Sequence, residues 1–298
     1  MRHIIPISGK DSLTTALVQM QRAPEYSYEL MYNVTGVELP EVDDWLSRVE
    51  QYLGLSIHRV GKNLEDIIDE QGMLPNVKAR YCTRMAKIYP MEDWIGVEPA
   101  LVYYGIRADE KRTGYINTKK PNITPIYPLV EEGIGLDGVM ERLHAINLMP
   151  PSFFWQSLYA DVVQLLGSDA VLIERLHPIA RQQLFAGRTR PNCFFCFFQR
   201  GYEWVWLLET HPDLFWRSVE IEETTGAEDY TWRYKQSLRE LAEKAPQMKA
   251  NRAKKVASAI CDMFAPKQAK WFDDGNGDEA GDVPDMLQVV SCGLLCGK

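Results

Sequence analysis

The 298-residue sequence has no long apolar run, no secretory start and no excess of positive charge. No stretch reaches the roughly 18 apolar residues that mark a transmembrane helix. The first residues enter a strand-like segment directly, without the basic and apolar regions of a signal peptide. We therefore expect a cytoplasmic protein with no membrane partner. The formal net charge of -8 argues against a nonspecific nucleic-acid binder, but it leaves room for a local basic face.

Cysteine is also scarce. Six cysteines are too few for the disulfide framework of a secreted protein, and they suit metal or redox chemistry in a reducing compartment. Cys193 and Cys196 are spaced CxxC, and Cys292 and Cys296 are spaced CxxxC. There is no internal repeat. With 46% apolar residues, the chain can form one large domain or a main domain with a smaller one appended.

The first part of the sequence alternates strand-like and helix-like segments. Apolar runs predict strands at 3–7, 28–34, 57–61, 100–107 and 123–129. Amphipathic spacing predicts helices at 12–23 and 40–55. This succession predicts an α/β fold, in which helices cover both faces of a parallel sheet.

The later pattern divides the chain into three parts. Residues 1–136 form the predicted α/β domain, and residues 137–272 form an appended helical region that carries the CxxC pair. Residues 273–298 are a cysteine-containing tail. The tail begins with an acidic, glycine-rich segment at 273–285, which is typical of a flexible linker.

The stretch from Ser8 to Ser12 lies between the first predicted strand and helix. In one interpretation it is a polar turn in which Ser8 or Asp11 caps the helix. In the other it is an anion cradle. Gly9 then lets the backbone approach a phosphate, helical amides point at that phosphate, and Lys10 and the two serine hydroxyls complete the match. The spacing differs from that of the GxxxxGK[ST] phosphate loop.

Ligands of parallel α/β sheets bind beyond the carboxyl ends of the strands. The residues that follow the second and fourth predicted strands are therefore further candidates for the same site. They are Thr35, Gly36, Gly105 and Arg107.

The loop resembles the SGGKDS loop of the PP-loop ATP pyrophosphatases, which have an adenine nucleotide α-hydrolase-like fold. Three later segments resemble motifs of the phosphoadenylyl-sulfate (PAPS) reductase family. Residues 33–55 resemble its DTG-x-E-x-PE stretch, residues 80–91 its R-x-CT-x-x-x-K-x-x-P segment, and residues 103–112 its GIR-x-x-E motif. Two departures stand out: Val34 replaces the aspartate of DTG, and the loop has one glycine where the family usually has two.

The resemblance implies ATP and Mg²⁺ as ligands. It implies that Asp11 helps to hold the metal, that Lys10 neutralises charge on the leaving pyrophosphate, and that Arg107 reaches the phosphates. The implied nucleotide contacts are Ser8, Gly9, Lys10, Asp11, Ser12, Thr35, Gly36, Gly105 and Arg107.

The resemblance also implies a metal centre, because iron-sulfur members of the family place cysteines in matching segments. Cys82, Cys193 and Cys196 supply three of the four thiolates that a four-iron cluster, or zinc as the alternative, would need. Thr83 stands where a fourth ligand would be, so Cys292 or Cys296 is expected to complete the site, or one iron stays open. From the residues alone, the CxxC pair could equally be buried thiols.

The end of the chain, SCGLLCGK, resembles the ECGLH-type terminus of sulfonucleotide reductases, with Leu295 in place of the histidine. There a mobile cysteine attacks the sulfur of a sulfate group, which makes Cys292 a candidate nucleophile. Cys296 would be its resolving partner. Cys261, in a helical segment, is expected to be a core residue.

Three functions follow. In the first, the enzyme adenylates a substrate with ATP, releases pyrophosphate, and serves sulfur transfer to a nucleic acid or nucleotide. The retained Lys10, Asp11 and Ser12 favour it, because sulfonucleotide reductases typically lack this ending. The second is a sulfonucleotide reductase that uses Cys292, and the third is a nucleotide-binding module without activity. Basic stretches at 111–120 and 249–255 could touch nucleic acid, although solvated helix faces explain them equally well.

Overall fold

The computed structural model describes residues 1–111, 114, 120–151, 153–191, 193–225 and 230–265. Five strands form one sheet: β1 (Arg2–Pro6), β2 (Tyr28–Val34), β3 (Ile57–Gly61), β4 (Ala100–Tyr103) and β5 (Ile123–Ile126). Their order is β3-β2-β1-β4-β5, and each neighbouring pair is parallel. The predicted α/β class with a parallel sheet is confirmed.

Side-chain alternation explains why helices cover both faces of the sheet. Ile5 and Leu30 face the larger apolar cluster, whereas their chain neighbours Ile4 and Met31 face the smaller one on the opposite side. Helix α1 (Lys10–Arg22) packs on β1 and β4. Because the strands are apolar on both faces, each face needs a helical layer to exclude water.

Seven further helical elements belong to this part of the chain, within the residues that the structure describes. They are α2 (Glu41–Leu53), α3 (Leu64–Gln71), α4 (Tyr81–Thr83), the π-helical turn η1 (Arg84–Ile88), α5 (Tyr89–Ile95), α6 (Pro128–Glu131) and α7 (Leu136–Ala145). Elements η1 and α5 pack on the β3 side of the sheet. Helix α7 packs against α1, so it lies with the α/β layers in the structure.

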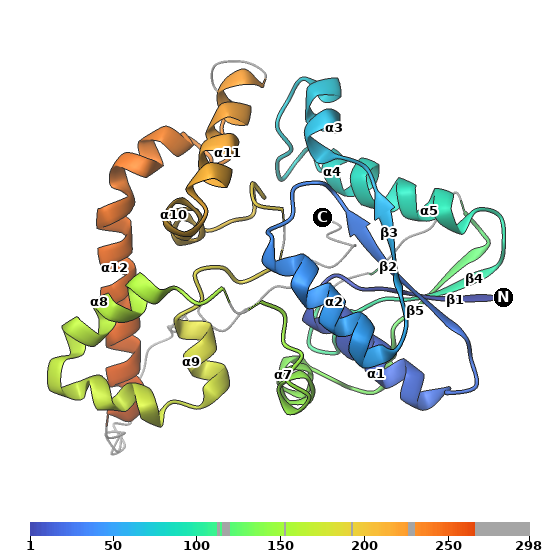
Figure 1. The fold of residues 1–298 in the computed structure, drawn as a ribbon, viewed down its shortest axis with the longest axis horizontal. Helices are drawn as coiled ribbons and strands as arrows, with labels where there is room; N and C mark the ends of the chain where they lie inside the picture. Colours follow the sequence, from blue (N-terminus) through green and yellow to red (C-terminus); the bar gives the residue numbers. More distant parts are fainter. Residues whose placement is uncertain (112–113, 115–119, 152, 192, 226–229, 266–298) are drawn as a thin grey trace, which may run out of the picture.

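The predicted helical region is present and lies beside the sheet (Figure 1). It contains α8 (Gln156–Leu166), the 3-10 helix η2 (Gly167–Arg175), α9 (Pro178–Leu184), α10 (Gly201–Thr210), α11 (Pro212–Thr224) and α12 (Leu238–Phe264). Helices α9 and α11 begin at Pro178 and Pro212, because proline has no amide hydrogen and fits only the first turn of a helix. Helix α12 packs along α8 and α10.

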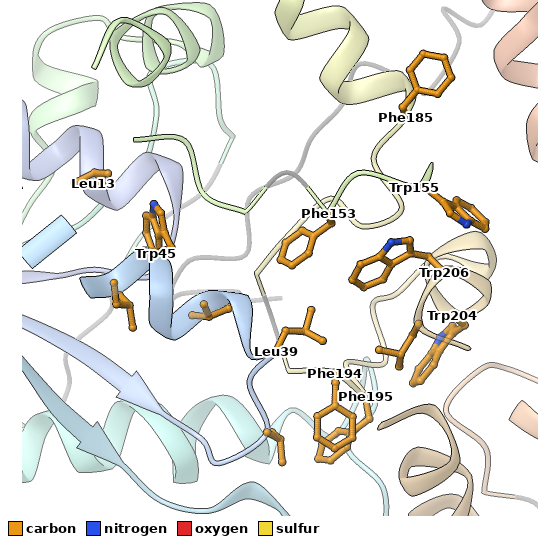
Figure 2. Close-up of a cluster of buried hydrophobic side chains, with 14 of the residues drawn as sticks. Leu13, Leu39, Trp45, Phe153, Trp155, Phe185, Phe194, Phe195, Trp204 and Trp206 are labelled. Atoms are coloured by element: carbon orange, nitrogen blue, oxygen red, sulfur yellow. The ribbon is translucent and has the colours of Figure 1, made fainter. Parts of the chain in front are cut away.

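One apolar cluster joins the sheet layers to the helical region. Leu13 and Trp45 from the α/β part, and Trp204 and Trp206 from α10, all belong to it. Leu39, in the segment before α2, lies between the two groups in Figure 2. The domain boundary at residue 136 stays a prediction, and the tail at 273–298 lies outside the described residues. None of the helices in the described part of the chain has the length and apolar content needed to span a membrane.

Candidate functional site

The strand order places the candidate site between β1 and β4. Strand β1 has β2 on one side and β4 on the other. The strand order therefore reverses at β1: the chain first adds strands on the β2 side and then returns to add β4 and β5 on the other side. A crevice opens at such a reversal beyond the carboxyl ends of the strands, and ligands of α/β sheets bind there. The loop from Ser8 to Lys10 follows β1, and the loop from Gly105 to Glu110 follows β4. The predicted phosphate loop therefore lies at the edge where a nucleotide is expected.

Ser12 closes the loop on itself. Its hydroxyl accepts hydrogen bonds from the amides of Ser8 at 2.7 Å and Gly9 at 3.1 Å, and it donates to the Gly9 carbonyl at 3.0 Å. The contact of Ser12 with a phosphate stays a prediction, and in the structure its hydroxyl bonds the backbone of the loop. It fixes the loop at the N-terminus of α1, where the helix dipole favours an anion.

Gly105 lets the β4 loop approach the start of α1. A Cβ atom on Gly105 would lie 2.6 Å from the Ser12 amide nitrogen and 2.7 Å from the Asp11 carbonyl carbon. Both neighbours are backbone atoms, which cannot rotate away. The absence of a side chain at this position is therefore what brings the two halves of the candidate site together.

A buried group of charges lies beside the loop. The Lys10 ammonium is 3.4 Å from Asp11 Oδ2, and Arg107 Nη1 is 3.3 Å from the same oxygen. The side chains of Asp11 and Arg107 are each 6% exposed. Burial lowers the pKa of Lys10; Asp11 opposes this shift and Arg107 adds to it. Asp11 therefore bridges the two cations, which fixes the Lys10 ammonium beside the start of α1.

Two more carboxylates hold Arg107. Its Nε donates to Asp109 Oδ1 at 2.8 Å, and its Nη1 lies 3.2 Å from Glu110 Oε1. Burial by itself lowers the pKa of Arg107, but Asp11, Glu110 and Asp109 together raise it. Asp109 also accepts from the Leu136 amide at the start of α7, at 3.1 Å. The sequence assigned Arg107 to the phosphates. In the structure its guanidinium is held by carboxylates, and to contact a phosphate it would have to exchange one of them.

The residues after β2 form a second part of the site. Glu38 Oε1 accepts from both the amide and the hydroxyl of Thr35, each at 2.6 Å. Gly36 has a φ of 75°, a conformation that favours glycine. This turn holds Thr35 at the carboxyl edge of the sheet, next to the crevice.

The CxxC segment lies along the same edge. The Thr35 hydroxyl is 3.4 Å from Cys193 Sγ, and the Phe194 amide donates to the Val37 carbonyl at 2.8 Å. Two residues earlier, Pro191 Cγ lies 3.8 Å from the Cβ position of Gly9. The segment thus spans from the phosphate loop to the end of β2.

Cys82, in α4, belongs to the same neighbourhood. Burial raises the pKa of its thiol and Cys193 raises it further, whereas Lys87 and Arg80 act in the opposite direction. Burial, with Cys193, also raises the pKa of Cys196 to about 11. Because Cys193 acts on both of the other thiols, the three predicted cysteines lie near one another.

These thiols do not by themselves make a metal centre. Within the described ranges, no group of three or more histidine, cysteine, aspartate or glutamate side chains is arranged to hold a metal ion. The expected fourth ligand Cys292, like Cys296, lies outside the described residues. The iron-sulfur cluster and its zinc alternative stay predictions.

Sequence reasoning missed several residues that build the site. Arg188 is 2% exposed. It donates to the carbonyls of Arg190 and Cys193 and so fixes the backbone of the CxxC segment. Asp109 and Glu38 were also not singled out, although each lies within a motif that was quoted. Arg188 and Pro191 lie in no quoted motif, and the contact of Pro191 with Gly9 joins distant parts of the chain. Cys261 is exposed and is not the core residue that we expected.

The comparisons with known proteins agree with this geometry. Residues 2–176 match the family model described as the phosphoadenosine phosphosulfate reductase domain. The match covers the whole sheet, the phosphate loop, Arg107 and Cys82, and it ends before the CxxC pair. No curated protein matches the chain.

Proposed function

The chain belongs to the phosphoadenosine phosphosulfate reductase domain family, and we propose that this PP-loop family enzyme binds ATP at the carboxyl edge of its sheet and transfers AMP to an acceptor. Pyrophosphate is the second product. The acceptor that we propose is a nucleic acid or a nucleotide. A sulfur nucleophile, such as a thiolate, then attacks the position that bears the AMP group, and AMP leaves with the electron pair of the broken bond.

The paired Lys10 and Asp11 at the start of α1 carry the proposal. A lysine that is largely buried beside a helix N-terminus supplies positive charge where water screens it little. A reaction that only reduces a sulfonucleotide has no pyrophosphate to release, so it does not need that charge. The Lys10, Asp11 and Ser12 ending therefore favours cleavage of ATP between its α and β phosphates.

The chain's residues take the following parts. An acceptor oxygen attacks the α phosphorus, the bond from that phosphorus to the bridging oxygen breaks, and pyrophosphate leaves with the electron pair. Lys10 stabilises the charge that develops on the leaving group. Asp11 would hold Mg²⁺ together with the phosphates, since Mg²⁺ in such sites is bound by one or two carboxylates and the substrate; the metal would neutralise phosphate charge. Arg107 positions Asp11, and the amides at the start of α1 orient the phosphates.

The test uses the full chain with ATP and Mg²⁺, and water as a slow substitute acceptor. We expect AMP and pyrophosphate as products and a measurable ATP affinity by calorimetry. Lys10→Ala should weaken ATP binding about ten- to hundredfold, because a charge-assisted contact contributes roughly 1.5–3 kcal/mol. The control is Lys244→Ala, which removes an exposed lysine of α12.

Three results contradict the proposal. Products of ADP and phosphate would move the cleavage to another bond. Unchanged ATP affinity in Lys10→Ala would remove the lysine from the site. Sulfite release from adenylyl sulfate or phosphoadenylyl sulfate, without any pyrophosphate from ATP, would establish the reductase instead.

A further inference from the structure

Two consecutive tight turns carry the CxxC pair. The Cys196 amide donates to the Cys193 carbonyl at 3.1 Å, and the Gln199 amide donates to the Cys196 carbonyl at 2.9 Å. A four-residue turn keeps its first and last Cα atoms within about 7 Å. Disulfides join Cα atoms about 4.4–6.8 Å apart. The backbone therefore holds Cys193 and Cys196 at a separation that a disulfide can bridge.

The surroundings fix these turns. The ring of Phe195 stacks on Trp232 with centroids 4.9 Å apart. The Gln199 side chain donates to the Phe194 carbonyl at 2.5 Å. Phe194 and Phe195 are buried, whereas the two cysteines that flank them are half-buried. The apolar residues thus anchor the segment, while both cysteines stay partly exposed.

The arrangement of the two thiols suits disulfide formation, a two-electron oxidation, better than it suits coordination of a metal. A disulfide needs only two cysteines held by one turn. A tetrahedral zinc or a four-iron cluster needs four donors, and the described residues do not arrange even three. Thr83 occupies the place beside Cys82 where a further thiol would be required.

We infer that Cys193 and Cys196 form a reversible dithiol-disulfide pair that exchanges with low-molecular-weight disulfides such as oxidised glutathione. The thiolate of one cysteine attacks a glutathione sulfur, and one glutathione thiolate leaves. The second cysteine attacks the mixed disulfide, the Cys193–Cys196 bond forms, and the second glutathione leaves. The pair loses two electrons and two protons, which the two glutathione thiols carry.

The pair lies beside the nucleotide edge, because Cys193 contacts Thr35 and Pro191 packs against Gly9. It is nevertheless a site of its own. The inference rests on the cysteine turns and not on the proposed ATP chemistry, so either can fail without the other.

The experiment uses the full chain, purified without oxygen, with iron and zinc counted before any treatment. The protein is then equilibrated in glutathione buffers of increasing oxidised fraction, quenched with an alkylating reagent and digested with trypsin. We expect the peptide that contains both cysteines to lose two hydrogens in oxidising buffer and to regain them in reducing buffer. Cys196→Ser should trap a glutathione adduct on Cys193, because no second thiol can displace it.

Cys82→Ser and Cys261→Ser are the matched controls, and both should leave the oxidised peptide unchanged. The inference is overturned if the pair stays reduced in fully oxidised glutathione. It is also overturned if the bond forms between Cys82 and either partner, or if the purified chain holds stoichiometric iron or zinc that Cys193→Ser removes.

Discussion

At the scale of single residues, one glycine in the phosphate loop and one in the β4 loop differ in whether a side chain would fit at their positions. Gly9 has a φ of 163°, an extended conformation that any residue adopts, and a Cβ there would meet only Pro191 Cγ at 3.8 Å. Gly105 has the more stringent position, because its Cβ would overlap backbone atoms of Asp11 and Ser12. The sequence assigned both glycines to the nucleotide, whereas in the structure the close packing of the β4 loop on α1 depends on Gly105.

We therefore predict that Gly105→Ala destabilises the fold by about 1–3 kcal/mol or more, the usual cost of overpacking. Gly9→Ala should change the free energy of unfolding by no more than about 0.5 kcal/mol. Urea unfolding of both variants measures the difference. Equal stabilities would mean that the β4 loop can move away from α1.

Arg107 shows what a motif cannot tell. GIR-x-x-E predicted a cation at the nucleotide edge, and the structure has it there. The partners of that cation depend on packing between α1 and the β4 loop, which brings Asp11 within 3.3 Å across 96 residues of sequence. No local pattern encodes a contact of that range.

At the scale of elements, a single carboxylate joins α11 to the start of α12. Glu222 is 6% exposed and accepts from the amides of Trp232 at 2.8 Å and Leu238 at 2.7 Å. Leu238 is the first residue of α12, whose early amides have no partner within the helix. Burial raises the pKa of Glu222, although the two amides oppose that shift.

The raised pKa sets the sign of a pH effect. The folded protein holds the Glu222 proton more tightly than the unfolded chain does, so protonation favours folding below the unfolded value of about 4.5. This contribution is lost as pH rises through the folded pKa. We predict that, relative to Glu222→Gln, the wild-type chain loses free energy of unfolding between pH 4.5 and neutrality. Parallel curves for the two proteins would contradict the shift, and urea titrations across that range measure it.

The elements also show how far sequence patterns reach. The predicted strands at 28–34 and 57–61 match β2 and β3 residue for residue. Strand β2 is largely apolar because most of it is buried inside the sheet, whereas β3 is an edge strand with mostly exposed side chains. Helix α3 and the helical stretch from α4 to α5 were not predicted. The latter contains the π-helical turn Arg84–Ile88, whose spacing disrupts the 3.6-residue period. Within the predicted helical region at 137–272, residues Gly167–Arg175 form a 3-10 helix.

At the scale of the whole molecule, the tail is the part that sequence alone assigns. Residues 273–298 lie outside the described residues, so the role of Cys292 stays a prediction from the sequence.

We predict that truncation after residue 285 leaves the free energy of unfolding, the ATP affinity and pyrophosphate release unchanged and abolishes sulfur transfer, the step in which Cys292 would act as the sulfur carrier. Cys292→Ser in the full chain should reproduce the loss if the thiol is responsible. Calorimetry, pyrophosphate release and the amount of sulfur-containing product are the measurements. Full sulfur transfer by the truncated chain would remove Cys292 from the reaction.

The contact between Thr35 and Cys193 joins residues 158 positions apart, and the one between His211 and Glu41 joins residues 170 apart. Closing loops of this length costs chain entropy that later contacts must offset, so such pairings form late in folding. During synthesis the sheet emerges from the ribosome well before the CxxC segment follows it. The contacts at the carboxyl edge are therefore complete only when about two thirds of the chain has been made. A stalled or cleaved chain retains the sheet and its own helices, but Leu39 and Trp45 then lack the α10 members of their apolar cluster, and apolar surface left uncovered in this way favours aggregation.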